Sequence, residues 1–267
     1  MTKFSFSRFI YLDTCVFAEL VKKQNLIRPF FDFIVQNDLC IAVSQALWIE
    51  LSPKKETYQI INTILTLLPS AVIKKQDELL DKEVKSHPNM YNATLLKSPL
   101  NQLMGTQFIQ KKLSSFRTTI ARREMLQYSS LMNQKLDQLK PNFPPLKSGK
   151  YSLNSAELFA EQIVFRWIST EYPLFVNQFK ENMSAFNSDV FKSLKIFAYY
   201  VYYKYYNQNK TVSKSDFADL FHLYCMPYCH FAIVERDMCH ILNQIKSRNR
   251  ILNGVIVKNM EFFNEIK

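Results

Sequence analysis

The chain has 267 residues, of which 48% are apolar and 14% aromatic, and a formal net charge of +11. With only 3 glycines, it contains neither of the glycine-rich motifs that bind nucleotide phosphates, which excludes those classes of nucleotide-binding protein. The longest apolar run, residues 196–203, is too short to cross a bilayer, and the N-terminus lacks the features of a signal peptide. The 5 cysteines have no disulfide-framework spacing, so we expect reduced thiols in a soluble cytoplasmic protein without a membrane partner.

Two strand–helix units open the chain. In RFIYLDTCVFAEL, an apolar run predicts a buried strand over residues 8–12, which ends at Asp13 and is followed by a helix. In LCIAVSQALWIEL, a second strand over residues 39–43 precedes a serine-capped helix over 45–51. A helix over 55–68 and a third strand in SAVIKK continue the pattern. This succession predicts a parallel sheet with crossover helices.

The middle of the chain has a different pattern. Residues 77–210 show apolar side chains at helical spacing and no strand signal. The strand–helix pattern then resumes, with a helix over 214–226, a strand over 231–235, a helix from Asp237 to 247 and a strand over 254–258. We therefore predict an α/β domain formed by both ends of the chain, residues 1–76 and 211–267, with an all-helical insertion over 77–210.

Four acidic residues occupy positions where parallel sheets form their sites, the C-terminal ends of the strands. Asp13 and Asp237 follow predicted strands, and Glu50 lies less than two turns into the helix after the second strand. Asp219 lies in the helix before the strand at 231, and Asp216 competes with it because residues three apart share a helix face. Taken singly, each acid is also explained as a helix cap or a surface ion-pair residue.

The joint placement of these acids indicates a metal site. Clustered carboxylates raise one another's pKa values unless a cation compensates them. Mg²⁺ or Mn²⁺ fits best, because hard cations prefer carboxylate oxygen and water. Such a site activates water for phosphodiester cleavage.

The positive charge is concentrated in one stretch. Residues 97–150 contain ten basic and two acidic side chains, and so supply 8 of the 11 net positive charges. A concentrated basic patch favours a nucleic-acid partner, although a solvated basic helix surface explains it equally well. The candidate phosphate-binding residues are Lys111, Lys112, Arg117, Arg122 and Arg123 on one predicted helix, and Lys246, Arg248 and Arg250 in KSRNR.

The acids lie in the segments YLDTCVF, SQALWIEL and DLFHLYCMPYCHFAIVERD, and in these segments the chain resembles the PIN-domain family of metal-dependent ribonucleases. The resemblance covers roughly residues 8–75 and 211–260. It implies an α/β/α sandwich with a central parallel sheet and an endoribonuclease that uses Mg²⁺ or Mn²⁺ to leave a 5′-phosphate and a 3′-hydroxyl. The metal ligands that it implies are Asp13, Glu50, Asp219 and Asp237, with Asp216 as the alternative to Asp219.

The resemblance has further implications for partners. Because the family consists of ribonucleases, it implies RNA as the substrate. Many bacterial members are toxins, so an inhibitory protein partner is possible, and so is a homo-oligomer. The four acids are equally compatible with a nuclease that acts on DNA. In a hypothesis of a different class, His230 and Glu235 depart from the family pattern and mark a binding module without catalysis.

Two other patterns have simpler explanations. The cysteines and histidines between residues 222 and 240 lack the paired spacing typical of a zinc site, so Cys225 and Cys229 are expected to be buried free thiols and His222 to pack on its helix. The run FAYYVYYKYY could stack nucleic-acid bases, but helical spacing places most of its rings in the core, with only Tyr206 and its neighbours at the surface.

Overall fold

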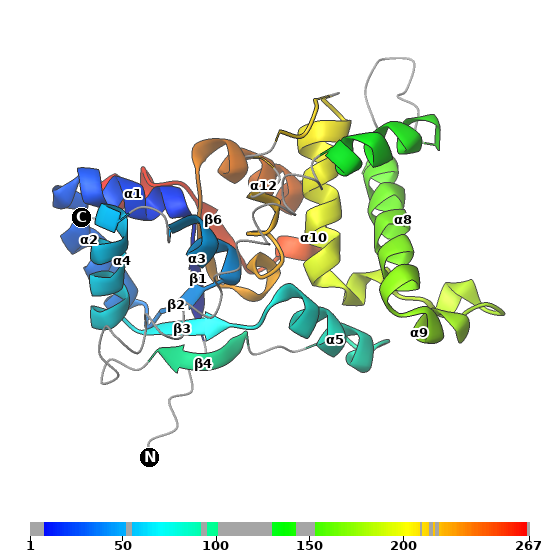
Figure 1. The fold of residues 1–267 in the computed structure, drawn as a ribbon, viewed down its shortest axis with the longest axis horizontal. Coiled ribbons are helices and arrows are strands. Elements are labelled where there is room, and N and C mark those ends of the chain that lie inside the picture. The colour runs from blue at the N-terminus through cyan, green and yellow to red at the C-terminus, as the bar shows by residue number, and fades with distance from the viewer. Residues whose placement is uncertain are drawn as a thin grey trace.

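A computed structural model describes residues 8–51, 55–91, 95–100, 130–142, 153–208, 210–213, 216 and 219–265. At its centre lies a six-stranded sheet in the order β4-β3-β2-β1-β5-β6 (Figure 1). The strands are β1 (Phe9–Leu12), β2 (Cys40–Val43), β3 (Ser70–Ile73), β4 (Leu96–Leu100), β5 (Phe231–Ile233) and β6 (Ile256–Lys258). All neighbouring pairs are parallel except β4, which runs antiparallel to β3. The predicted α/β fold with a parallel sheet is therefore confirmed.

Helices connect and cover the strands. The longer helices are α1 (Thr14–Lys22), α2 (Ile27–Gln36), α3 (Gln45–Leu51), α4 (Lys55–Leu67), α5 (Gln76–Ser86), a helix over 130–139, α8 (Leu153–Glu171), α10 (Lys192–Val201) and α12 (Arg236–Arg248). Shorter helices are α9 (Pro173–Asn177) and α13 (Phe262–Glu265), and a π-helical turn over Tyr202–Tyr206 continues α10. Among the described residues, no helix combines the length and the apolar character that crossing a bilayer requires.

Alternation along β1 divides the core into two layers. Ile10 and Leu12 point toward the face covered by α1, α2 and α4. Phe9 and Tyr11 point toward the opposite face, where α10 and α12 pack. Figure 1 shows these two helical layers with the sheet between them and α8 outside α10. Strands buried on both faces are typical of parallel sheets, and they require nearly continuous apolar runs such as FIYL.

The helical segment between β3 and β5 packs directly on the sheet. Ile196 and Tyr200 of α10 belong to the same buried cluster as Tyr11 of β1 and Ala42 of β2. The expectation that residues 77–210 contain no strand is wrong, because β4 pairs with β3 at the edge of the sheet. Its sequence, LKSPL, lacks a strand pattern, and proline in a sheet is confined to edge strands and bulges.

The aromatic run on α10 is a core element. Tyr199, Tyr200, Tyr202 and Tyr203 are all buried, which agrees with the expectation that most of these rings lie in the core. The expectation that Tyr206 lies at the surface is wrong, since it is 3% exposed and its ring stacks on Tyr202 with centroids 5.6 Å apart. In the π turn, the Asn207 N–H donates to the Tyr202 carbonyl at 2.8 Å, one residue further than in an α-helix.

The helix expected over residues 214–226 is much shorter. Its described part is helical only at 216 and 219–220, and turns then lead to a 3₁₀ turn over Met226–Tyr228. The apolar side chains here are buried around the whole segment rather than on one face, so the pattern does not define an amphipathic helix. Pro227 lies in the first turn of the 3₁₀ helix, just before the chain enters β5.

Candidate metal centre

The candidate centre lies where the order of the strands reverses. The chain builds outward from β1 through β2 and β3 on one side, and it returns as β5 on the other side of β1. In open α/β sheets, ligands bind at the carboxyl ends of the strands on either side of such a reversal, here β1 and β5. Asp13 occupies this position, and its N–H donates to the carbonyl of Ile233 at the end of β5 at 2.9 Å.

The side chain of Asp13 is held on both oxygens. Its Oδ1 accepts a hydrogen bond from the Thr14 N–H at 2.6 Å, so Asp13 is also the N-cap of α1. Its Oδ2 accepts from the Cys15 thiol at 3.5 Å and from the Glu235 N–H at 3.4 Å. Only 7% of the residue is exposed. Asp13 is therefore both the N-cap of α1 and a fixed carboxylate at the carboxyl end of β1.

Glu50 reaches the same point from α3. The Thr14 hydroxyl donates to Glu50 Oε2 at 2.8 Å and lies 3.2 Å from Asp13 Oδ1. One hydroxyl thus bridges two carboxylates that are far apart in the sequence. This agrees with the sequence-based expectation that Asp13 and Glu50 converge.

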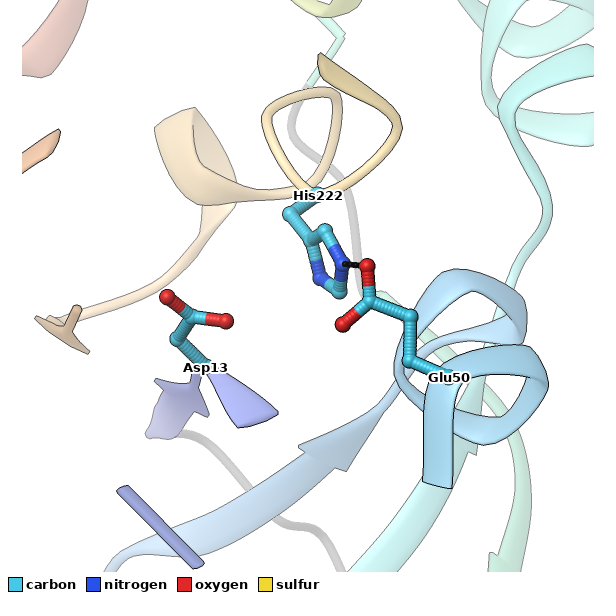
Figure 2. A group of neighbouring side chains, drawn as sticks. All are labelled: Asp13, Glu50 and His222. Carbon is cyan, nitrogen blue, oxygen red and sulfur yellow. Dashed lines mark ion pairs between the residues drawn. The ribbon is translucent and has the colours of Figure 1, made fainter. Parts of the chain in front are cut away.

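His222 is the third member of the cluster. It is fully buried, and its Nε2 lies 3.1 Å from Glu50 Oε1 (Figure 2). Nε2 therefore faces Glu50 as an ion-pair contact, while Nδ1 is in close contact with the Tyr11 hydroxyl. Burial lowers the pKa of His222, but the hydrogen-bonding and charge of Glu50 and the charges of Asp13 and Asp219 outweigh burial and raise it.

Potential ligand atoms of Asp13, Glu50 and His222 all lie within 4.8 Å of one another. Figure 2 shows the three side chains pointing toward one another from the end of β1, from α3 and from the turn before β5. In the described ranges this is the one cluster of His, Cys, Asp and Glu side chains with such spacing. Cys225 and Cys229 are buried free thiols, as expected.

Asp219 faces this cluster without joining the close group. Its backbone carbonyl accepts from the His222 N–H at 3.1 Å, which places the two residues on one turn. Burial raises the pKa of the Asp219 carboxyl to about 7, and the charges of Glu235 and Asp13 add to this rise, while His222 and Lys204 oppose it. Burial is thus the main cause of the raised pKa of Asp219, and repulsion from neighbouring carboxylates adds to it, as it does at Glu235.

The remaining two predicted ligands gather around a lysine. Lys204 Nζ lies 3.4 Å from Asp216 Oδ1 and 3.4 Å from Asp237 Oδ2. Asp216 also accepts from the Ser213 N–H at 3.0 Å and from its hydroxyl at 2.7 Å. Burial raises the pKa of Asp216, but the hydrogen bonds from Ser213 and the charge of Lys204 outweigh burial and lower it.

Three of the eight predicted phosphate-binding residues can be placed, and they lie away from the centre. The other five, Lys111, Lys112, Arg117, Arg122 and Arg123, lie outside the described residues. Of the three that can be placed, Lys246 donates to the backbone carbonyl of Val255, and Arg248 lies over the ring of Tyr203 at 5.7 Å. Arg248 ends α12 and Asp237 begins it, so at about 1.5 Å per residue roughly 16 Å of helix separates them. Arg250 is exposed just beyond that end.

Two residues that contact predicted ligands, His222 and Lys204, were not among the predicted site residues, although a role for His222 near the metal site was an alternative to packing on its helix. His222 lies three positions after Asp219, a spacing that places two side chains on one face of a helical turn, and this signal was available. Lys204 stands alone among tyrosines in YYKYY, and a lone charge in a buried run usually has a buried partner. The sequence did not indicate that its partners are two of the predicted metal ligands.

A scan of models of known protein families, a search of curated proteins and a search of solved structures found no match to this chain. The fold and the centre themselves define the class: an α/β protein with a carboxylate–imidazole cluster at the switch point of a parallel sheet.

Proposed function

We propose that this protein is a metal-dependent endoribonuclease that hydrolyses RNA phosphodiester bonds at the centre formed by Asp13, Glu50 and His222. The observation that carries the proposal is the approach of these three side chains, from distant parts of the sequence, to within 4.8 Å at the carboxyl edge of the sheet. The resemblance of the three acid-bearing segments to PIN domains supports the choice of reaction and substrate.

The donor set fits a divalent ion. It combines two carboxylates with a buried imidazole nitrogen, His222 Nε2, which lies 3.1 Å from Glu50 Oε1. Carboxylates suit both Mg²⁺ and Mn²⁺, whereas an imidazole ligand favours Mn²⁺ over Mg²⁺. When bound, such an ion polarises a phosphoryl oxygen and lowers the pKa of bound water.

The surrounding residues orient these ligands. A metal-binding histidine usually donates its second ring N–H to a neighbour. In this role Nδ1–H of His222 would donate to the Tyr11 hydroxyl, and Nε2 would exchange its contact with Glu50 Oε1 for the ion. The Thr14 hydroxyl fixes Glu50 against Asp13. Asp219, whose pKa is near 7, is suited to release a proton when positive charge enters the centre.

The decisive experiment replaces Asp13 by Asn. Asparagine is as good an N-cap as aspartate, so α1 and the melting temperature are expected to be retained. Mn²⁺-dependent cleavage of a single-stranded RNA is expected to be abolished. Asp32→Asn, on the exposed surface of α2, is the matched control and keeps full activity. Wild-type cleavage rates in a folded Asp13→Asn protein would refute the assignment, and a DNA strand of the same sequence, tested in parallel, separates RNA from DNA as the substrate.

A second function is an interaction module without catalysis, favoured by the positive charge that the fold itself supplies to these acids. Lys204 contacts Asp216 and Asp237, and His222 contacts Glu50, so several carboxylates are compensated without an ion. A titration with Mn²⁺ separates the two functions. A nuclease centre gives a melting temperature that rises with Mn²⁺ concentration, and a metal-free module does not.

A further inference from the structure

Lys204 is a buried cation built into the candidate centre. It lies in the π turn that continues α10, and its side chain is 9% exposed. Its ammonium nitrogen lies 5.4 Å from the ring centre of Tyr200 and 5.6 Å from that of Tyr205, so two aromatic faces flank it. Single π turns inside helices frequently lie at functional sites.

Three oxygen atoms surround the ammonium group of Lys204, one for each of its N–H donors. Asp216 Oδ1 and Asp237 Oδ2 lie at 3.4 Å, and the Tyr200 hydroxyl lies at 3.3 Å. Its partners come from three different segments: α10, the helical position at residue 216 and the start of α12. The side chain is therefore held in one position by the fold.

The positive charge of Lys204 also lies near acids that it does not contact directly, among them Glu235 and Asp219. The start of α12 connects this charge to the cluster: Asp237 Oδ2 lies 3.4 Å from Lys204 Nζ, and the N–H of Glu235, two residues earlier, donates to Asp13 Oδ2 at 3.4 Å. The charge of Lys204 also opposes the rise in the pKa values of Asp219 and Glu235. Lys204 and the cluster of Asp13, Glu50 and His222 thus belong to one electrostatic site, with the ammonium on the α12 side and the metal-ligand atoms on the β1 side.

We propose that the ammonium of Lys204 takes the place of a second divalent ion, so that the centre binds a single Mn²⁺ and Lys204 supplies the other positive charge. The catalytic role of this charge rests on the proposed nuclease function. Enzymes that cleave phosphodiesters commonly use two cations to stabilise the attacking and the leaving oxygens. A fixed ammonium supplies electrostatic stabilisation of that kind without reorganisation during the reaction.

The test counts bound ions. Isothermal titration with Mn²⁺ is expected to give one ion per wild-type chain and two per chain of Lys204→Met, because the substitution vacates the space between Asp216 and Asp237 and leaves their charges uncompensated. The triple variant Lys204→Met/Asp216→Asn/Asp237→Asn is expected to return to one ion. Two ions in the wild type, or the same count in wild type and Lys204→Met, would overturn the proposal.

Lys195 offers a matched control on the same helix. It is also buried, and its ion-pair partners are two carboxylates, Glu157 and Asp189. Lys195→Met removes a buried ammonium from between two acids that lie outside the candidate centre. It is expected to lower the melting temperature without adding an ion, so a gain of one ion in Lys195→Met would also overturn the proposal.

The same set of variants also shows whether a change in ion count comes from a loss of folding. If Lys204→Met folds only when Mn²⁺ is present, the ion has replaced the ammonium and the proposal is supported. If it does not fold even then, the count is made on Lys204→Gln, which keeps a polar side chain and removes the charge. Failure of the nuclease proposal gives a different result, because wild-type protein then cleaves no RNA while the change in ion count caused by Lys204→Met is still measured.

Discussion

Glu83 is fully buried in α5, and its carboxyl group joins three parts of the fold. It accepts hydrogen bonds from the Ser193 N–H at 2.9 Å and from the Ser193 hydroxyl at 2.6 Å, in the first turn of α10. It also accepts one from the Tyr228 hydroxyl, just before β5. Burial raises the pKa of Glu83 from 4.5 to about 7, although these hydrogen bonds and the charge of Lys192 lower it.

The raised pKa makes stability depend on pH in a defined direction. As the pH rises above 4.5, the unfolded chain loses the Glu83 proton while the folded chain keeps it until the pH reaches about 7. The free energy of unfolding therefore falls with rising pH across this window and levels off above it. At about 1.4 kcal/mol per pKa unit, the loss between about pH 5 and about pH 8 is about 2.5 kcal/mol.

Glu83→Gln removes this ionisation and keeps the shape of the side chain. Urea unfolding near both pH values is expected to show that the variant gains about 2.5 kcal/mol relative to wild type as the pH rises. Glu181→Gln, the same substitution at an exposed site, controls for general effects of charge. If the difference in unfolding free energy between wild type and Glu83→Gln is the same at both pH values, the reasoning about Glu83 is wrong.

Two further predictions concern the candidate centre. Tyr11→Phe removes the hydroxyl next to His222 Nδ1 and is expected to weaken Mn²⁺ binding about 10- to 100-fold, measured by titration calorimetry. Tyr203→Phe, which removes another buried hydroxyl bonded to Asn249, is expected to leave the affinity unchanged; equal affinities in the two variants would contradict the orienting role. Mn²⁺ binding near pH 7 is expected to release more protons from the wild type than from Asp219→Asn, because the ion lowers the raised pKa of the Asp219 carboxyl. Calorimetry in buffers of different ionisation enthalpy measures the number of protons released. Equal proton release from both proteins would contradict this role of Asp219.

Local patterns predicted the elements whose burial is continuous. FIYL and CIAV are apolar throughout because helices cover both faces of the sheet. An acidic residue directly after such a run marks the end of the strand. This is why the position of Asp13 at the end of β1 could be predicted. The pairing of β4 with β3 could not, since an edge strand is stabilised by its neighbour rather than by its own pattern.

The composition of the centre depends on contacts that no local pattern records. Asp237 was predicted as a metal ligand and Asp216 as the alternative to Asp219, but the deciding neighbour, Lys204, belongs to a segment that was predicted to be a helical insertion. Its reach toward the acids is set by the packing of α10 on the sheet and by the π turn at its end. Tertiary packing therefore decided which carboxylates remain for an ion.

The strand order also governs when the centre can form during protein synthesis. Asp13 and Glu50 emerge from the ribosome early, but β1 acquires its neighbour β5 only after residue 233 has been made. His222 and Lys204 arrive late as well, so a nascent or truncated chain carries isolated carboxylates in place of a completed centre. We therefore expect the candidate centre to be completed only after β5 has been made, because β1 needs this neighbour to fix the position of Asp13.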